Sequence, residues 1–205
     1  SIPGVSTADI DRVFLSADLN GEIRPSGISL HEKPNILVLV LEGVSGAFIP
    51  SFTRSADFDS KAQMPKLDSW MAKGLRFNTF VSHQRGTSRG LYAMLCGAYP
   101  KLRTLTSKMT EYINYPNRRC LPSILREQGY DTAYLQAAPL RFMSKDQFMA
   151  KAGFNHIHGA NTFTQGYVKS AWGVDDRGLL EGVERFLSHL SEKPVSYTHL
   201  TLPTN

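Results

Sequence analysis

The sequence has no long apolar run: no stretch approaches the roughly 18–20 apolar residues that a membrane-spanning helix needs. It also lacks an N-terminal signal-peptide pattern, internal repeats and low-complexity tracts. Basic residues are scattered and the net charge is only +5, which argues against a nucleic-acid-binding protein. With 41% hydrophobic residues among 205, the composition predicts a globular protein with one main core.

Cysteine is scarce, and the two residues present, Cys96 and Cys120, leave two interpretations open. They form either a disulfide, as in a periplasmic or extracellular protein, or two buried thiols. The chain does not begin with methionine, so we expect it to be a piece of a longer protein. The mild positive charge suits anionic substrates such as phosphate esters, sulfate esters or lipid headgroups.

Strand and helix patterns alternate along most of the chain. Residues 1–33 contain several prolines and glycines and are predicted to form a connecting arm. Beyond them the predicted strands are 35–41, 75–81 and 131–138, and the predicted helices begin near Pro65, after Thr87, at Leu121, at Ser144 as a cap, and around the apolar stripe of residues 179–190. This alternation predicts an α/β fold with a mostly parallel sheet and helices on both faces.

The last residues, 195–205, differ from the rest of the chain. The fold calls for another buried strand here, but the sequence Val195 to Asn205 is half polar. One interpretation is an edge strand. The interpretation that we favour is a non-native tail, because the segment resembles a translated library adapter. The native domain would then be residues 34–194, incomplete at its C-terminus.

Two oxygen-bearing side chains indicate a catalytic site. The apolar run 35–41 is typical of a central parallel strand, and it ends on Glu42. Thr87 lies between small and cationic residues, just ahead of a helical run. A carboxylate and a hydroxyl at one sheet edge are what a metal-activated oxygen nucleophile needs. The alternatives are a solvated loop carboxylate for Glu42 and a helix N-cap for Thr87.

Several stretches, in this order and spacing, resemble the first half of a sulfatase-type catalytic domain of the alkaline phosphatase superfamily. The resemblance is greatest to its lipoteichoic acid synthase-like branch, the phosphoglycerol transferases. The stretches are 33–42, Met64-Pro65-Lys66-Leu67-Asp68, Gly86-Thr87-Ser88-Arg89-Gly90 with Leu95-Cys96-Gly97, Leu121-Pro122-Ser123-Ile124-Leu125 with Gly129-Tyr130, and Trp172-Gly173-Val174-Asp175-Asp176.

The resemblance places Thr87 at the nucleophile position, because Gly97 follows ten residues later as in the sulfatase motif. Arg89 and Leu91 stand where sulfatases have the Pro and Arg that direct formylglycine formation, which favours phosphoryl transfer by the threonine itself. The resemblance also implies that Glu42 and Thr87 contact a divalent metal ion, manganese or magnesium. The downstream Asp-His pair that completes the family's metal site is absent from this sequence, so we expect the fragment to bind metal poorly and to be inactive.

Candidate substrate contacts are cationic. Lys145 occupies the stretch where the transferases have a substrate-binding arginine, and Arg85 and Arg89 flank Thr87. Each has the alternative of being an ordinary solvated cation. For His156 and His158, packing or a surface position is favoured over a metal role, and the pair Asp175-Asp176 is interpreted as the cap of the last helix.

These features predict a metal-dependent enzyme on the extracytoplasmic face of the cell membrane, anchored by segments absent from this chain. It would transfer a phosphoryl-bearing headgroup from a lipid donor through a covalent threonine intermediate. The alternatives are a sulfuric ester hydrolase and a degenerate sulfatase-like domain that only binds.

Overall fold

The computed structural model describes residues 33–52, 64–75, 77, 80, 86–99, 109, 112, 119–163, 169–170, 173–189 and 195–198. The chain divides into two compact units, residues 1–33 and 34–205. Of the predicted connecting arm, residues 1–33, the structure describes only Lys33. The described helices and strands all belong to the second unit.

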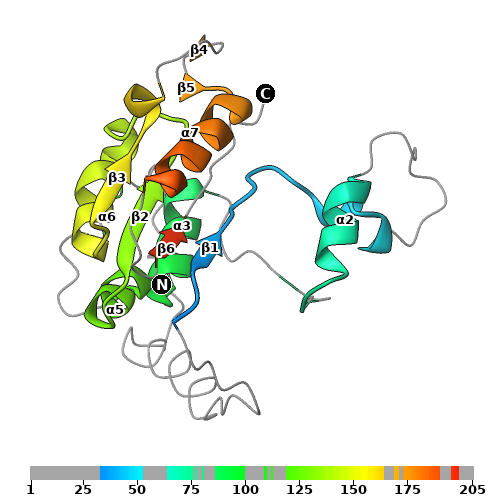
Figure 1. Cartoon of the computed structure of the whole chain (residues 1–205), viewed down its shortest axis with the longest axis horizontal. Helices are drawn as coiled ribbons and strands as arrows, with labels where there is room; N and C mark the ends of the chain where they lie inside the picture. The colour runs from blue at the N-terminus through cyan, green and yellow to red at the C-terminus, as the bar shows by residue number, and fades with distance from the viewer. Residues whose placement is uncertain are drawn as a thin grey trace, which may run out of the picture. The chain divides into compact units, whose positions relative to one another are not determined.

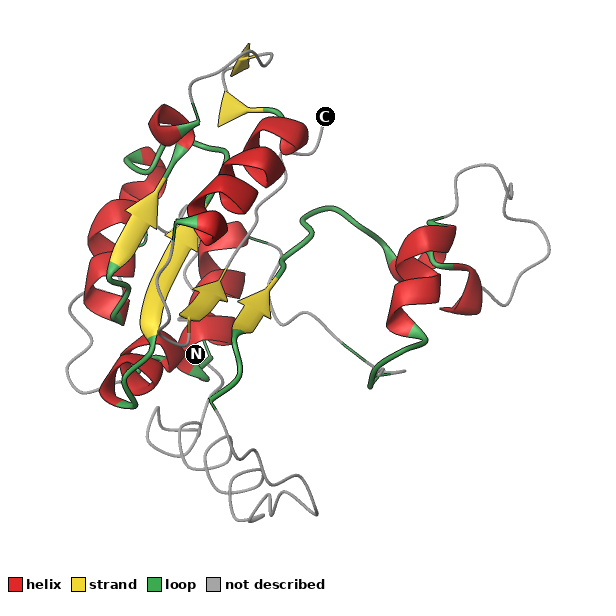
Figure 2. Cartoon of the chain, in the orientation of Figure 1, coloured by secondary structure: helices red, strands yellow, loops and turns green. Residues whose placement is uncertain are grey.

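A four-stranded parallel sheet organises this unit, with the strand order β1-β6-β2-β3 (Figure 1). Its strands are β1 (Ile36–Val38), β2 (Asp131–Leu135), β3 (His156–His158) and β6 (Val195–Thr198). A separate antiparallel pair joins β4 (Lys169–Ser170) to β5 (Gly173–Val174). Because parallel neighbours need crossover connections, helices separate the strands in the chain, as Figure 2 shows. The predicted α/β fold with a mostly parallel sheet is confirmed.

The helices begin where the sequence predicts them. They are α2 (Pro65–Met71), α3 (Thr87–Cys96), α5 (Leu121–Glu127), α6 (Lys145–Ala152) and α7 (Asp176–Ser188), and short 3-10 turns cover Gly46–Phe48, Pro50–Phe52, Phe142–Ser144 and Ala160–Thr162. Helix α3 ends at Gly97, whose φ of 57° places it in the left-handed region that glycine favours. Asp175 caps α7 by accepting a hydrogen bond from the backbone N–H of Gly178 at 2.8 Å, which confirms its predicted capping role.

Successive residues of β2 pack into different cores because side chains along a strand alternate between the two faces of a sheet. Tyr134 belongs to a core built with α3 and α6, which includes Leu95 and Phe148. Its neighbours Ala133 and Leu135 belong to a second core built with α7. Figure 1 shows α3 and α7 on opposite sides of the strands. Helices therefore cover both faces, as predicted.

Three local predictions need correction. Strand β1 is shorter than 35–41, and among the described strands it has a partner on one side only, so it lies at the edge of the described sheet; Leu37 is 53% exposed. The predicted strand 75–81 is described at three positions only. These three residues are exposed and belong to no helix or strand: Leu75, Phe77 and Phe80. The rest of that range lies outside the described residues. Strand β6 pairs on both sides and is not an edge strand. The non-native origin of 195–205 stays a prediction.

Candidate active site

The two side chains on which the predicted chemistry depends are in contact. The Thr87 hydroxyl donates a hydrogen bond to Glu42 Oε1 at 2.5 Å, although 45 residues separate them in the chain. Glu42 lies in the turn that follows β1, and Thr87 is the first residue of α3. The bond is partly buried. The fold thus places a carboxylate and a hydroxyl together at the carboxyl end of a parallel strand, which is where α/β proteins commonly place their sites.

Thr87 does not serve as the cap of α3, so the N-cap alternative is wrong. Gly86 occupies the N-cap position, with an extended backbone and no side-chain capping bond. The Thr87 hydroxyl is directed to Glu42 instead. An oxygen at the first position of a ten-residue helix also lies beside backbone N–H groups that have no intrahelical acceptor, and these favour negative charge.

Lys145 is buried, with only 4% of its surface exposed, which excludes a solvated position on the helix. Its ammonium donates a hydrogen bond to Gln136 Oε1 at 3.1 Å. Burial lowers the pKa of Lys145, and the negative charge of Glu42 opposes this by raising it. Glu42, the partner of the Thr87 hydroxyl, is thus the charged residue whose effect opposes that of burial on the Lys145 pKa.

The backbone just before α6 has an uncommon conformation. Met143 and Ser144 have φ values of 61° and 57°, the only positive values outside glycine among the described residues. Non-glycine residues in this region cost about 1–3 kcal/mol each and persist where the surrounding structure holds them. One such restraint is the hydrogen bond from the Met109 N–H to the Met143 carbonyl at 2.8 Å. Ser144 occupies the N-cap position as predicted, but its side chain makes no capping bond, because capping geometry requires an extended backbone.

Of the two other candidate cations, Arg89 and Arg85, the structure describes only the first. Arg89 is half-buried in the first turn of α3, two residues beyond Thr87. Arg85 lies outside the described residues.

The donors at the site fit a hard divalent cation, because a carboxylate and a hydroxyl offer oxygen ligands. Glu42 and Thr87 supply these two oxygens. Within the described part of the chain, no group of three or more His, Cys, Asp or Glu residues could hold a metal ion. The two residues thus offer two oxygen donors, fewer than the six or more ligands that such a cation usually takes.

The histidines of β3 are engaged in packing, as the sequence analysis favours. His156 Nε2 lies 2.9 Å from Asp131, and both imidazoles contact the ring of Phe186 on α7. Burial lowers the pKa of His158, and neighbouring His156 lowers it further. A cavity of about 300 Å³ lies beside them, lined by His158, Phe163, Phe186 and other residues, but not by Glu42, Thr87 or Lys145. This region is distinct from the candidate active site.

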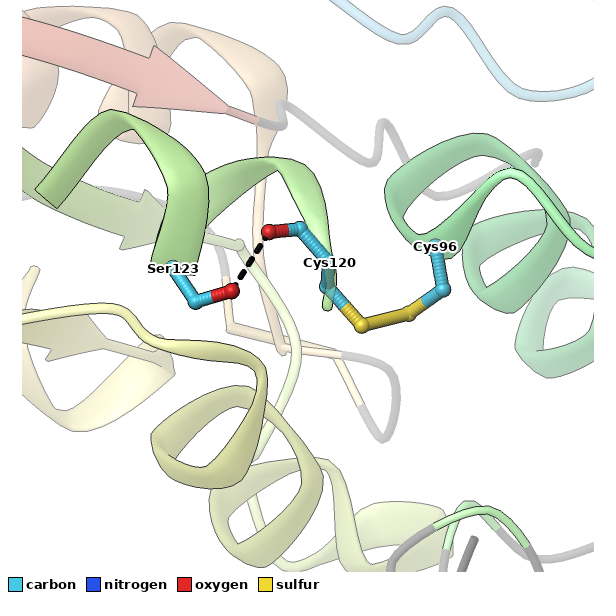
Figure 3. Close-up of a disulfide and its surroundings, with 3 residues drawn as sticks. All are labelled: Cys96, Cys120 and Ser123. Atoms are coloured by element: carbon cyan, nitrogen blue, oxygen red, sulfur yellow. Dashed lines mark hydrogen bonds between the residues drawn. A yellow bond between two sulfur atoms is a disulfide. The ribbon is translucent and has the colours of Figure 1, made fainter. Parts of the chain in front are cut away.

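Cys96 and Cys120 form a disulfide, which decides between the two interpretations that their number left open (Figure 3). Cys96 is the last residue of α3, and Cys120 directly precedes α5. Ser123 Oγ donates a hydrogen bond to the Cys120 carbonyl at 2.7 Å, as Figure 3 shows. The bridge therefore ties the far end of the helix that begins with Thr87 to the neighbouring helix.

Gln136 was missed by the sequence analysis. It directly follows β2, is fully buried, and accepts the hydrogen bond from Lys145. The available signal was a lone amide within the predicted buried strand 131–138. Such a residue needs a buried hydrogen-bonding partner, although the sequence does not say which one.

The sulfatase family profile matches residues 34–202, and the chain therefore belongs to the sulfatase family. Among curated relatives, phosphoglycerol transferase I of Xanthomonas campestris (strain ATCC 33913) is 33% identical over 154 residues, which cover 69% of this chain and 22% of the relative. Phosphoglycerol transferase I of Escherichia coli (strain 55989) is 27% identical over 157 residues, covering 71% of this chain and 20% of the relative. The chain thus spans about a fifth of the length of these relatives.

Solved structures share the fold. An alkaline phosphatase superfamily protein from Vibrio parahaemolyticus has a TM-score of 0.68 and 22% identity, over 85% of this chain and 41% of that protein. The lipoteichoic acid synthase LtaP from Listeria monocytogenes has a TM-score of 0.68 and 17% identity, over 84% and 41%. These similarities show that the chain shares their fold, while the family match and the relatives confirm the resemblance found in the sequence.

Proposed function

We propose that this chain is part of a transferase that moves a phosphoryl-bearing headgroup, such as phosphoglycerol, through a covalent intermediate on Thr87. The observation that carries the proposal is the hydrogen bond from the Thr87 hydroxyl to Glu42, which orients a lone pair of the hydroxyl oxygen for attack. The names of the relatives, phosphoglycerol transferase I, support this class of headgroup.

The reaction has two balanced steps. Thr87 Oγ1 bonds to the phosphorus of the donor lipid while the ester bond to the lipid's own alcohol breaks. The hydroxyl proton moves towards Glu42 Oε1, its acceptor in the structure, and the departing alcohol takes up a proton. An acceptor hydroxyl, or water, then attacks the same phosphorus and releases Thr87. Lys145 and Arg89 offer positive charge for the phosphoryl oxygens, although a lysine lacks the bidentate fork of an arginine.

A manganese or magnesium ion, held by Glu42 and Thr87, would stabilise the threonine alkoxide and neutralise charge on the phosphoryl group. The sequence supplies no Asp-His-Gly-like motif to add further ligands. We therefore expect the 205-residue chain to bind manganese weakly and to be inactive alone. Sub-micromolar manganese binding in calorimetry would contradict this.

The disulfide supports a location outside the cytoplasm, because such bonds persist in oxidising compartments. We place the domain on the extracytoplasmic face of the membrane, close to lipid donors. No helix within the described residues is long and apolar enough to cross a bilayer.

Sulfuric ester hydrolysis is the second candidate, because the family match is to sulfatases. Thr87, Arg89 and Leu91 disfavour it, since the pattern for formylglycine formation is missing. A degenerate domain that only binds is the third, and a full-length gene without the downstream Asp-His pair would favour it.

The experiment is mass spectrometry of the Thr87 peptide after the full-length parent protein has been incubated with phosphatidylglycerol. We expect a headgroup adduct on Thr87, its loss in Thr87→Val, and its retention in Ser88→Ala, the matched control next to it. An unmodified Thr87 together with sulfate release from an aryl sulfate would instead support the hydrolase.

A further inference from the structure

Gln136 connects three buried groups next to the candidate active site. Its amide oxygen accepts hydrogen bonds from the Tyr134 hydroxyl at 2.7 Å and from the Lys145 ammonium at 3.1 Å. Its amide nitrogen donates to the Ala138 carbonyl at 3.0 Å. Tyr134 and Gln136 are fully buried and Lys145 nearly so. Every polar group in this network has a partner, which is the condition under which a buried network holds one geometry.

Only one orientation of the amide satisfies these contacts. An ammonium is a donor only and a carbonyl an acceptor only, so a flipped amide would oppose its NH₂ to Lys145 and its oxygen to the Ala138 carbonyl. The backbone N–H of Gln136 also donates to the His158 carbonyl at 3.0 Å, which fixes the main chain at this point. The side chain of Lys145 is thus anchored to a group that cannot turn away.

The neutral charge of Gln136 matters as much as its position. A carboxylate here would compensate the ammonium, whereas an amide accepts the hydrogen bond and leaves the positive charge intact. Gln136 uses one of the three ammonium N–H groups. Burial lowers the pKa of Lys145, and the charge of Glu42, the partner of Thr87, raises it by less.

We propose that Gln136 is a positioning residue, which holds the buried Lys145 ammonium in one place and keeps its charge available for the phosphoryl oxygens of an anionic substrate. The inference rests on the proposed function, because it takes Lys145 as a substrate contact. Tyr134 contributes by holding the amide oxygen of Gln136 from the other side.

The first arm of the test follows the Lys145 side chain in this chain by NMR, using ¹³Cε and ¹⁵Nζ signals, with no ligand added. In Gln136→Met, which keeps the volume but removes the acceptor, we expect the Lys145 Cε to become mobile. In Gln136→Glu, which retains an acceptor, it should stay ordered. Gln147→Met, an exposed position on the same helix, is the matched control and should change nothing. Unchanged Lys145 order in Gln136→Met would overturn the positioning role.

The second arm titrates the same proteins with inorganic phosphate. Because a hydrogen bond to a charged group contributes about 1.5–3 kcal/mol, affinity should fall at least about tenfold in Gln136→Met. We expect a similar loss in Gln136→Glu, despite an ordered Lys145. Wild-type affinity in Gln136→Glu would overturn the role of the neutral amide. If the unsubstituted chain binds no phosphate, the proposed anion site is contradicted, and the first arm still decides the positioning role. Thermal unfolding and the backbone amide spectrum check that each variant folds.

Discussion

Two clusters of ionisable side chains lie on opposite faces of the same sheet, and they differ in how far they are shielded from solvent. On the face covered by α3 and α6, Lys145 is buried and donates a hydrogen bond to Gln136. On the face covered by α7, His156 and His158 are neighbours on one strand and remain half-exposed. The first cluster holds a buried charge on a neutral amide, whereas the second consists of partly exposed rings that pack on Phe186.

The two clusters also differ in what they cost the folded protein. A buried lysine costs stability because its charged form is poorly solvated, so a fold that retains one needs another reason to do so. The histidines need no such reason, because they pack on Phe186 and pair with Asp131.

Removing the disulfide should have the largest effect, on the face that carries Thr87. The Cys96→Ala/Cys120→Ala variant should lose about 3 kcal/mol of unfolding free energy, because the bridge closes a loop between residues 24 apart in sequence. Urea unfolding with and without dithiothreitol measures this. The reductant should destabilise the wild type and leave the variant unchanged. Equal midpoints for wild type in both conditions would mean that the bridge does not constrain the fold.

Replacing the buried Lys145 should raise the stability of the folded protein rather than lower it. We expect Lys145→Met to raise the free energy of unfolding at pH 7 by about 1 kcal/mol, because an apolar side chain removes the cost of a buried charge. Tyr134 continues to donate to Gln136, so no buried oxygen loses its last partner. Lys151→Met, on the exposed part of the same helix, should change stability by less than about 0.5 kcal/mol. A large loss of stability in Lys145→Met would show that the lysine is structural.

Asp175, the N-cap residue of α7, allows a stability test on the other face of the sheet. Asp175→Ala should cost about 1 kcal/mol, because the Gly178 N–H loses its acceptor. Asp175→Asn keeps an oxygen acceptor and should retain most of this stability. Thermal unfolding of the three proteins measures the difference. If both variants behave alike, the charge of Asp175 contributes more than its hydrogen bond.

The smallest effect should be the pH dependence contributed by His158. Burial holds its pKa below the ordinary value of 6.5, so the unfolded chain takes up this proton first as the pH falls. Its contribution to stability is therefore complete above pH 6.5 and decreases below it. Urea unfolding at pH 7.5 and 5.5 should show a smaller pH dependence in His158→Gln than in the wild type. An equal dependence in both proteins would place the titrating group elsewhere.

Much of the fold could be predicted because its signals are local. Pro65 begins α2, Gly97 ends α3, and the apolar stripe of α7 follows the helical period. The position of β1 could not be predicted in this way, since a run of apolar residues does not show how many neighbours the strand has. Likewise, the number of cysteines could not decide whether they were paired.

The residue types of the site were also evident in the sequence, through the resemblance that singled out Thr87, Glu42 and Lys145. Their sequence context did not show that Lys145 is buried, because a single lysine in a short helix has no periodic signal. Gln136 gave even less indication, since its role depends on partners that other elements bring to it.

The sequence sufficed for the fold class, the helix ends and the chemical types available, because these depend on short-range geometry and periodicity. The tertiary structure was needed to show that Thr87 meets Glu42 across 45 residues and that a neutral amide holds a buried ammonium. Such contacts depend on how a parallel sheet brings the loops after separate strands to one edge. No local pattern in the chain shows which residues will meet there.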